Sequence, residues 1–302
     1  KMPSSSKSHL RLISTLTAAS LIGFKALHSG SNMAQADKRR PYFESAVTLN
    51  PMYEKRYKKG EDNYVVRDQF ICVTDGVGGW QRKMVDPGLF TKEYVSHIAT
   101  LYDQKQYKSL KDLLDTASKL TVAKGSSTCV MAQLVEVRDP KGQDSLMTCN
   151  LGDSGYMWLV PKASPGQSGK AEAEIAFKSE SQQHRFNAPF QTGTDKKWPT
   201  KAFSTSHRAQ HNDIVVMGSD GIFDNLFPSD ILSCMNDFID PKTLNITDLQ
   251  GTSNCLSTLA EIKGYDPKYE SPFAIEAKAH GRKFRGGKSD DITVIVAQVK
   301  LD

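Results

Sequence analysis

The sequence predicts an α+β fold of layered antiparallel sheets and helices. Strand-like runs come in groups, helix-like segments come in two pairs, and no internal repeat is present. Strands that alternated regularly with helices would indicate a doubly wound parallel sheet, so the grouped order favours the layered antiparallel class. At 302 residues the chain can form one large domain or two small ones, with a sizeable core.

The spacing of apolar residues locates the elements of the first half. A strand pair is predicted at 64–66 and 69–74, ending at an Asp-Gly turn. Apolar residues at helical spacing predict two amphipathic helices, at 89–102 and 110–122. Three strands are expected to follow, at 128–137, 146–151 and 156–160.

The second half continues the same grouping. Pro, Gly, Ser and Gln residues in 161–170 predict a loop. The apolar run 214–218 predicts a short buried strand, and 292–299 predicts the closing strand. A helix is expected near 229–239, with Ser229 as its N-cap. The next helix is expected near 247–262.

Composition narrows the class of function. Hydrophobic residues make up 38% of the chain and charged residues 24%, as in ordinary soluble globular proteins. The net charge of +5 is mild, and no basic stripe with interleaved aromatic residues is present, which argues against nucleic-acid binding. A locally basic rim that attracts phosphorylated surfaces is compatible with this charge.

The five cysteines are an odd number and include no Cys-x-x-Cys pair. Cys72, Cys129 and Cys149 lie within apolar strand-like runs, which do not offer the basic surroundings of a catalytic thiol. We therefore expect buried free thiols in a reducing compartment. The remaining two are Cys234 and Cys255.

Residues 1–40 differ in composition from the rest of the chain. No acidic residue precedes Asp37, whereas basic residues, Ser, Thr and Ala are frequent. Such a segment is typical of a mitochondrial transit peptide and predicts a location in the matrix; a secretory signal and a disordered tail are the alternatives. The apolar run 12–24 is too short to span a bilayer, so no transmembrane span is expected. We place the folded domain at 41–302.

Acidic residues stand beside Gly at the ends of several predicted strands. Carboxylates that converge on one sheet edge repel each other unless cations neutralise them, and oxygen-only ligands favour Mg²⁺ or Mn²⁺. The chain is therefore predicted to be a metal-dependent enzyme. For any single motif a plain turn is the alternative, since Asp-Gly is a favoured turn pair. The segments are 60–63, 74–79, 150–155, 219–224 and 287–293.

In their order these motifs resemble those of the metal-dependent type 2C Ser/Thr protein phosphatases, over about 42–301. The ordered set is far more specific than any single member. Further motifs resemble the small mitochondrial branch of that family. The family motifs are Glu61-Asp62, Asp75-Gly-x-Gly-Gly, Gly125-Ser-Ser-Thr128, Gly152-Asp153-Ser154, Ser219-Asp-Gly-Ile-Phe-Asp224 and Asp290-Asp-Ile-Thr; those of the branch are Asp75-Gly-Val-Gly-Gly-Trp80, Asn150-Leu-Gly-Asp-Ser-Gly155, Phe186-Asn-Ala-Pro-Phe-Gln191, Ser271-Pro-Phe-Ala274 and Arg285-Gly-Gly-Lys288.

The resemblance implies a central sandwich of two antiparallel β-sheets flanked by pairs of α-helices, in the layered order α-β-β-α. It also implies a site for two Mg²⁺ or Mn²⁺ ions at one end of the sandwich. By the resemblance, Asp75 bridges both ions and the backbone carbonyl of Gly76 contacts the second. Asp220 and Asp290 complete the shell of the first ion, so that Asp75, Asp220 and Asp290 are the implied catalytic residues.

The resemblance gives the other acidic residues supporting roles. Glu61 acts through a metal-bound water, with Asp62 beside it. Asp153 and Asp224 match a weaker third-ion position of some relatives, and Asp291 lies outside the direct ligands. The full implied metal set is Glu61, Asp62, Asp75, Gly76, Asp153, Asp220, Asp224, Asp290 and Asp291.

The implied function is a hydrolase that removes phosphate from phosphoserine and phosphothreonine in proteins. Two cations about 3.5–4 Å apart can activate a water and offset charge on the phosphoryl oxygens, so no protein nucleophile is needed. The expected partners are phosphorylated proteins, and the sequence does not define the oligomeric state. The alternatives are a metal-binding scaffold or regulator of the same fold and another metal-dependent phosphoesterase, such as a nuclease.

Two positions depart from the family pattern. Val77 stands two residues after the bridging Asp, where many members have a His that serves as general acid. The phosphate-gripping Arg that precedes the first acidic pair in many members is also missing; the nearby candidates are Arg56, Lys58 and Lys59. Both departures predict modest turnover or altered substrate handling, and the substrate-binding residues stay unassigned.

Other polar features are interpreted as structural. His207 and His211 are spaced i, i+4 but lie in a polar stretch, so a surface loop is expected rather than a metal site. His184 is expected to be a structural histidine, with protonation of the leaving group as the alternative. Trp80 either lines the substrate mouth or is an ordinary half-buried residue. Residues 126–128 are expected to form a turn that leads into a strand, because no Lys follows in the P-loop manner.

Overall fold

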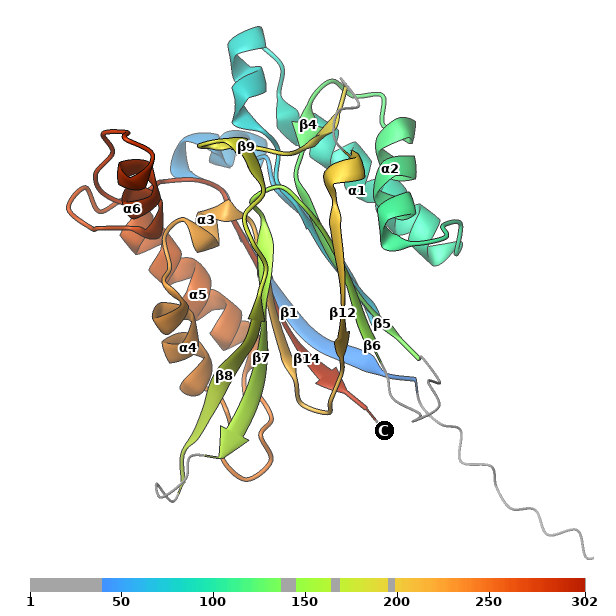
Figure 1. Cartoon of the computed structure of the whole chain (residues 1–302), viewed down its shortest axis with the longest axis vertical. Helices are drawn as coiled ribbons and strands as arrows, with labels where there is room; N and C mark the ends of the chain where they lie inside the picture. The colour runs from blue at the N-terminus through green and yellow to red at the C-terminus, as the bar shows by residue number, and fades with distance from the viewer. Residues whose placement is uncertain (1–39, 137–144, 164–168, 195–198, 302) are drawn as a thin grey trace, which may run out of the picture. The chain divides into compact units, whose positions relative to one another are not determined.

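The computed structural model describes residues 40–136, 145–163, 169–194 and 199–301. Two five-stranded antiparallel sheets lie face to face, and helices cover the outer face of each sheet (Figure 1). The strand order is β1-β14-β13-β7-β8 in the first sheet and β12-β6-β5-β3-β2 in the second. The predicted class, a layered α+β fold on antiparallel sheets, is therefore confirmed.

Strands of the first sheet are β1 Tyr42–Asn50, β7 Gly155–Ala163, β8 Ala171–Lys178, β13 Ile214–Gly218 and β14 Ile292–Lys300. Strands of the second sheet are β2 Asn63–Arg67, β3 Phe70–Thr74, β5 Cys129–Val135, β6 Ser145–Leu151 and β12 Phe203–Arg208. Two short pairs lie outside the sheets: β4 Ser126–Ser127 with β11 Thr192–Gly193, and β9 Gln183–Arg185 with β10 Ala188–Pro189.

The α-helices are α1 Pro87–Asp103, α2 Leu110–Leu120, α3 Asp220–Phe223, α4 Pro228–Asn236, α5 Leu249–Gly264 and α6 Pro272–Ala279. The short 3₁₀-helices are η1 Tyr53–Lys58, η2 Gly78–Lys83 and η3 Pro199–Lys201. Side-chain caps start four of the α-helices: Asp86, Ser109, Asp248 and Ser271 each accept a hydrogen bond from a backbone N–H of the first turn. Such a cap satisfies an N–H that the helix itself leaves unpaired.

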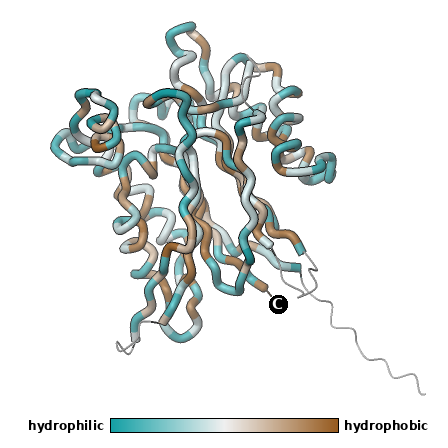
Figure 2. The backbone as a smooth tube through the Cα atoms, viewed as in Figure 1, coloured by the Kyte–Doolittle hydropathy of each residue, from teal (hydrophilic) through white to brown (hydrophobic). Residues whose placement is uncertain are grey.

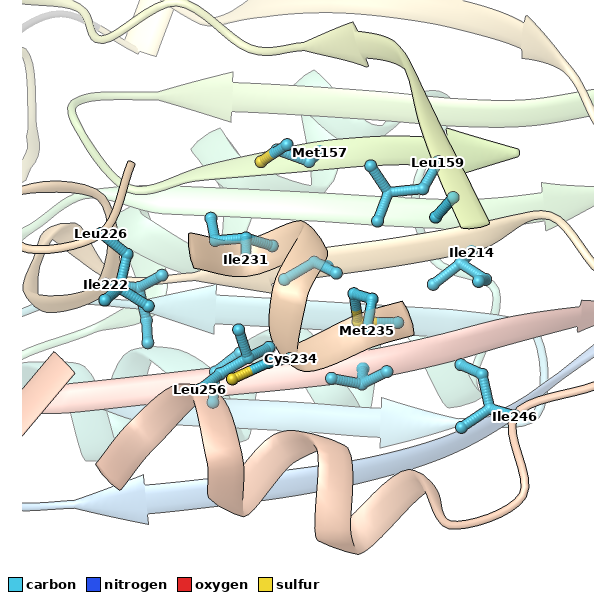
Figure 3. Close-up of a cluster of buried hydrophobic side chains, with 14 of the residues drawn as sticks. Met157, Leu159, Ile214, Ile222, Leu226, Ile231, Cys234, Met235, Ile246 and Leu256 are labelled. Carbon is cyan, nitrogen blue, oxygen red and sulfur yellow. The ribbon is translucent and has the colours of Figure 1, made fainter. Parts of the chain in front are cut away.

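Side chains of the central strands alternate between two apolar layers. In β13, Ile214 and Val216 pack against α4 and α5, whereas Val215 and Met217 pack against the second sheet. Figure 3 shows the first of these layers, with Ile231 and Met235 of α4 in front of the strands. Because successive strand residues face opposite sides and both sides are covered, the strand is apolar throughout. Helices α1 and α2 bury the outer face of the second sheet in the same way.

Apolar residues concentrate along the central strands, and hydrophilic residues dominate the loops (Figure 2). In the described part of the chain, none of the helices combines the length and the hydropathy that a bilayer span requires. All described residues belong to one compact unit, 38–302. The transit-peptide prediction falls on 1–40, which lies outside the described residues except for Arg40.

The structure adds elements that the apolar pattern does not reveal. These are the edge strands β1, β8 and β12 and the helix α6. Strand β7 continues through Pro161 to Ala163, so the predicted loop begins too early. Helix α4 begins at Pro228 and its N-cap is Phe227, whose N–H donates to the side chain of Asp230 at 2.9 Å. The predicted N-cap, Ser229, is therefore wrong.

Candidate metal centre

The acidic motifs converge at one end of the sandwich. Strand β2 begins after Glu61-Asp62 beside the end of β3, which precedes Asp75. Strand β13 ends before Asp220, beside the start of β14, which follows Asp290-Asp291. Antiparallel pairing brings the start of one strand next to the end of its neighbour. As a result, one carboxylate oxygen from each of Asp75, Asp153 and Asp220 lies within 4.8 Å of the other two.

Glu61 and Asp62 are almost fully buried, with exposed fractions of 1% and 2%. The backbone N–H of Glu61 donates to Asp291 Oδ2 at 2.8 Å, and its carbonyl accepts from Thr91 Oγ1 at 2.6 Å. Asp62 Oδ2 accepts from Thr293 Oγ1 at 2.8 Å. These contacts hold the first acidic motif against the start of β14, where the last acidic motif lies.

Lysine ammonium groups balance part of this negative charge. Lys288 Nζ contacts Asp220, lies 2.6 Å from Asp224 Oδ2 and 3.4 Å from Asp290 Oδ2. Its side chain is only 15% exposed. In the sequence, Lys288 is noticeable only as the last residue of the Arg285-Gly-Gly-Lys288 motif. The motif alone does not predict these ion pairs.

A second group of ammonium contacts comes from η1. Lys55 Nζ lies 2.8 Å from Glu61 Oε2, 3.2 Å from Asp290 Oδ1 and 3.1 Å from Asp291 Oδ2. Lys58 Nζ lies 2.6 Å from Glu61 Oε1. Sequence reasoning did not identify Lys55, because no local pattern marks a lysine of which two partners lie more than 200 positions away.

The other basic candidates near the first acidic pair behave differently. Arg56 pairs with Glu261 at 2.7 Å, and its guanidinium lies over the ring of Tyr53. Lys59 has a positive φ of 68° at the end of η1. Of the three candidates from the sequence, Lys58 is thus the one whose ammonium contacts the carboxylates.

Burial and mutual repulsion govern the charge of the carboxylates. Burial, and after it the neighbouring Asp220 carboxylate, holds the pKa of Asp75 well above its ordinary range. Burial raises the pKa of Asp224 to about 7, against the opposing effect of Lys288. Asp290 is the exception: burial acts to raise its pKa, but nearby ammonium groups, Lys288 foremost, hold it below the ordinary value. A divalent cation among these groups would favour their ionised forms.

Several buried oxygens in the cluster are left without a protein partner. Oδ1 of Asp62, Oδ1 of Asp153 and Oδ1 of Asp220 accept no hydrogen bond from the described residues. A buried, unpaired carboxylate oxygen is costly, and oxygen donors alone suit hard cations such as Mg²⁺ and Mn²⁺. The residues present therefore fit a divalent metal ion.

Two glycines let the acidic motifs approach each other. A Cβ at Gly221 would overlap the backbone carbonyl oxygen of Asp291. A Cβ at Gly76 would lie 2.9 Å from the carbonyl oxygen of Glu61. Because real Cβ atoms are not found that close to backbone oxygens, larger residues at these positions would push the motifs apart.

The turn after Asp75 is braced by the segment at 126–128. The backbone carbonyl of Asp75 accepts from Thr128 N at 3.0 Å, and Trp80 Nε1 donates to Ser126 Oγ at 2.6 Å. Ser126 and Ser127 form the short strand β4, which pairs with β11, so the expected turn is wrong for these two residues. The side chain of Val77 offers no group that can donate a proton.

The histidines singled out in the sequence lie in different settings. His207 lies in strand β12, stacks on Trp158 with ring centroids 5.3 Å apart, and is hydrogen-bonded to Tyr156 Oη at 2.7 Å. The expected surface loop is therefore wrong for His207. His211 and His184 are exposed, and in the described residues the candidate metal cluster contains no histidine.

The cysteines are only partly as expected. Cys72, Cys129 and Cys149 are buried free thiols, and burial raises the pKa of Cys149 to about 12. Cys234 of α4 and Cys255 of α5, in contrast, form a disulfide. The prediction of free thiols is wrong for this pair, because helix packing brings together two cysteines separated by 21 positions.

Known proteins are similar to this chain in sequence and in fold. No protein-family model matches the chain. "Probable protein phosphatase 2C 26" of Arabidopsis thaliana is 34% identical over 280 residues, 86% of this chain and 85% of that protein. "Protein phosphatase PTC7 homolog fig" of Drosophila virilis is 31% identical over 284 residues, 88% of this chain and 85% of that protein.

Among solved structures, the X-ray structure of the photosystem II phosphatase PBCP has a TM-score of 0.72 and 29% identity, and it covers 85% of this chain and 99% of its own. The catalytic domain of the serine threonine protein phosphatase PstP, in complex with two manganese ions, shares the fold with a TM-score of 0.53 and 15% identity, over 86% and 99%. These relatives, together with the acidic end of the two-sheet sandwich, identify the chain as a metal-dependent phosphatase. The chain belongs to the protein phosphatase 2C family of Ser/Thr protein phosphatases.

Proposed function

We propose that this enzyme removes phosphate from phosphoserine and phosphothreonine of protein substrates at the acidic end of the sandwich, using Mg²⁺ or Mn²⁺. The observation that carries the proposal is the convergence of Asp75, Asp153 and Asp220, with buried oxygens that no protein group satisfies. Membership of the phosphatase family supports the reaction. Bound ions would supply an activated water and offset charge on the phosphoryl group.

Different residues of the chain have different roles at this metal centre. Asp75, Asp220 and Asp290 would hold the divalent ions, and the Gly76 carbonyl would contribute a further oxygen. Asp153 adds a carboxylate beside Asp75 and Asp220. Preorganised ligands of this kind cost no rearrangement when charge develops during the reaction.

Glu61, Asp62, Asp224 and Asp291 act around the ions. Asp291 is already engaged by the backbone of Glu61, so it positions the first motif rather than binding an ion directly. Asp224 is paired with an ammonium group, that of Lys288. Val77 cannot protonate the leaving group, so the proton must come from a metal-bound water or another side chain, or the step proceeds without a general acid; modest turnover is expected.

The location in the mitochondrial matrix is part of the proposal. It is supported by the basic, acid-free composition before Asp37 and by the likeness to a PTC7 homolog. Fluorescent-protein fusions of 1–40 behind an initiator Met would be imaged in cells that hold both mitochondria and plastids. Mitochondrial targeting supports the proposal. Plastid targeting would overturn it. We include this outcome because the chain is similar to a photosystem II phosphatase.

Phosphate release from a phosphothreonine peptide tests the activity. Wild-type protein and a variant that begins at residue 41 should release phosphate with Mn²⁺ or Mg²⁺ and not with EDTA. Asp75→Asn should lose several orders of magnitude in kcat, because the bridging carboxylate is gone. The matched control is Asp103→Asn, an exposed carboxylate paired with Arg67, which should keep full activity. A folded protein that binds Mn²⁺ but releases no phosphate would favour the scaffold alternative.

A further inference from the structure

A second charged site, of the opposite sign, lies close to the metal centre. Helix α6 and the segments on either side of it line a pocket of about 680 Å³. We call it the basic pocket, because its lining carries five cations: Lys268, Lys278, Arg282, Lys283 and Arg285. Glu270 is the one carboxylate among the lining residues.

The charge of the basic pocket is not balanced from within the protein. In the described ranges, none of its five cations forms an ion pair, although neighbouring Lys263 does. All five side chains are exposed, and the sequence holds no acidic residue between 277 and 289. A concave surface with charge of one sign focuses its field and concentrates ions of the opposite sign. The pocket is therefore suited to an anionic ligand.

The wall of the basic pocket continues directly into the metal centre. The Gly286 carbonyl accepts from Ser271 Oγ at 2.7 Å, which fixes the loop after α6. Two residues further on, the side chain of Asn225 donates to the Lys288 carbonyl at 2.8 Å and accepts from Lys288 N at 2.9 Å. Three peptide steps separate Arg285 from Lys288, so their Cα atoms are at most about 11 Å apart. The Lys288 ammonium in turn contacts the acidic cluster.

The lining chemistry fits a short anionic peptide. Arginine guanidinium groups match carboxylate and phosphate oxygens in pairs, and lysines add point charges. Tyr269 and Phe284 provide apolar surface for the stem of a side chain or a backbone. A pocket of about 680 Å³ accommodates a few side chains, whereas duplex nucleic acid and a bilayer require an extended basic surface.

We infer that the basic pocket binds acidic or phosphorylated residues that flank the phosphorylated residue of the protein substrate. The inference rests on the proposed phosphatase function and extends it to a substrate class. Arg285 lines the pocket, and Lys288, three residues further on, contacts the acidic cluster, so one extended peptide of a few residues can reach both sites. The pocket thereby selects substrates with several acidic or phosphorylated positions around the target.

Two phosphothreonine peptides that differ only in their flanking residues test this inference. One carries Glu at three to five positions on either side, the other Gln. Wild-type enzyme should have a kcat/KM about tenfold higher for the Glu peptide at low salt, and the preference should shrink as salt rises. The triple variant Arg282→Gln, Lys283→Gln, Arg285→Gln should lose the preference but keep its kcat on the Gln peptide.

A matched control removes three exposed cations elsewhere. This control variant lowers the net charge by the same amount as the triple variant of the basic pocket. Its substitutions are in the α1–α2 region: Lys92→Gln, Lys105→Gln and Lys108→Gln. This variant should keep the preference for the Glu peptide. Equal loss in both triple variants would show a bulk-charge effect, and a wild-type enzyme without any preference would also overturn the inference.

A non-peptide substrate separates this inference from the proposed function. Hydrolysis of para-nitrophenyl phosphate with Mn²⁺, combined with no preference between the peptides, would leave the phosphatase function intact and reject the pocket's role. If no phosphate is released from any substrate, fluorescence anisotropy of a labelled phosphorylated Glu peptide still decides the question. Binding that the triple variant loses supports the pocket; preferential binding of anionic vesicles or RNA over the peptide rejects it.

Discussion

The carboxylate of Asp291 accepts a hydrogen bond of 2.8 Å from the backbone N–H of Glu61, across 230 positions of the sequence. Its other oxygen accepts from Met52 N at 2.8 Å. One buried side chain from the start of β14 therefore fixes the backbone that precedes β2. This relationship explains how acidic motifs at opposite ends of the domain keep a common geometry.

Asp291→Asn should destabilise the protein by about 1–3 kcal/mol. The amide NH₂ of Asn cannot accept, so one of the two backbone N–H groups loses its partner. Urea unfolding with EDTA present measures the loss, and Asp103→Asn at the surface should change stability by less than about 0.5 kcal/mol. An Asp291→Asn variant as stable as the control would contradict the role of this carboxylate.

Lys288→Met should make the metal-free protein less stable and more responsive to metal. Without the ammonium, Asp220 and Asp224 remain buried and uncompensated, which costs roughly 2–4 kcal/mol. Mn²⁺ should then raise Tm by more in the variant than in the wild type. Lys263→Met breaks a comparably buried pair with Asp230 and should show no such enhanced Mn²⁺ response. The account fails here if both variants respond to Mn²⁺ alike.

Asp213 gives a prediction for the pH dependence of stability. This residue is 2% exposed, and burial raises its pKa from 3.8 to about 6. The folded state therefore keeps the proton to higher pH than the unfolded state, and the stabilisation is lost as pH rises from about 4 to 6. Asp213→Asn resembles the protonated form, so it should match the wild type near pH 4.

The Asn variant should then exceed wild-type stability by about 1–2 kcal/mol at pH 7, with allowance for solvent screening. Urea unfolding across this pH range, with EDTA throughout, gives the difference. A difference that stays constant between pH 4 and 7 would show that Asp213 does not titrate in this window.

The Cys234–Cys255 disulfide should stabilise the domain by about 3 kcal/mol, from the loop of 21 positions that it closes. Mass spectrometry after alkylation under denaturing conditions should find three reactive thiols before reduction and five after it. Reduction should lower Tm in the wild type and leave a Cys234→Ala, Cys255→Ala variant unchanged. Five reactive thiols without reductant would restore the expectation of free cysteines.

The acidic motifs could be predicted because each combines an Asp with a strand end. An Asp at a strand end can be recognised from the residues around it in the sequence. The topology of the sheets then places Asp75 beside Asp220. The central strands could be predicted as well, since both their faces are buried and apolar. In the edge strand Ala171–Lys178 the buried residues are the small Ala171 and Ala173, with exposed Glu residues beside them, so the strand has only a weak apolar signal.

Contacts made only by tertiary packing were out of reach of the sequence. The carboxylates that pair with Lys55 lie beyond position 289 or in the neighbouring acidic motif. The residues next to Lys55 in the sequence do not predict this pairing. The pairing of Cys234 with Cys255 depends on how α4 packs against α5. The stacking of His207 on Trp158 depends on the pairing of β12 with β6 in the facing sheet.

Titration of the metal-stripped protein with Mn²⁺, followed on the same sample by phosphate release from a phosphothreonine peptide, tests the central claim most directly. We predict that two ions bind, that release begins as they bind, and that EDTA abolishes it. We also predict that Asp220→Asn binds fewer ions and releases almost no phosphate. A folded wild-type protein that binds no Mn²⁺, or that releases phosphate equally well in EDTA, would contradict the assignment of this acidic cluster as a catalytic metal centre.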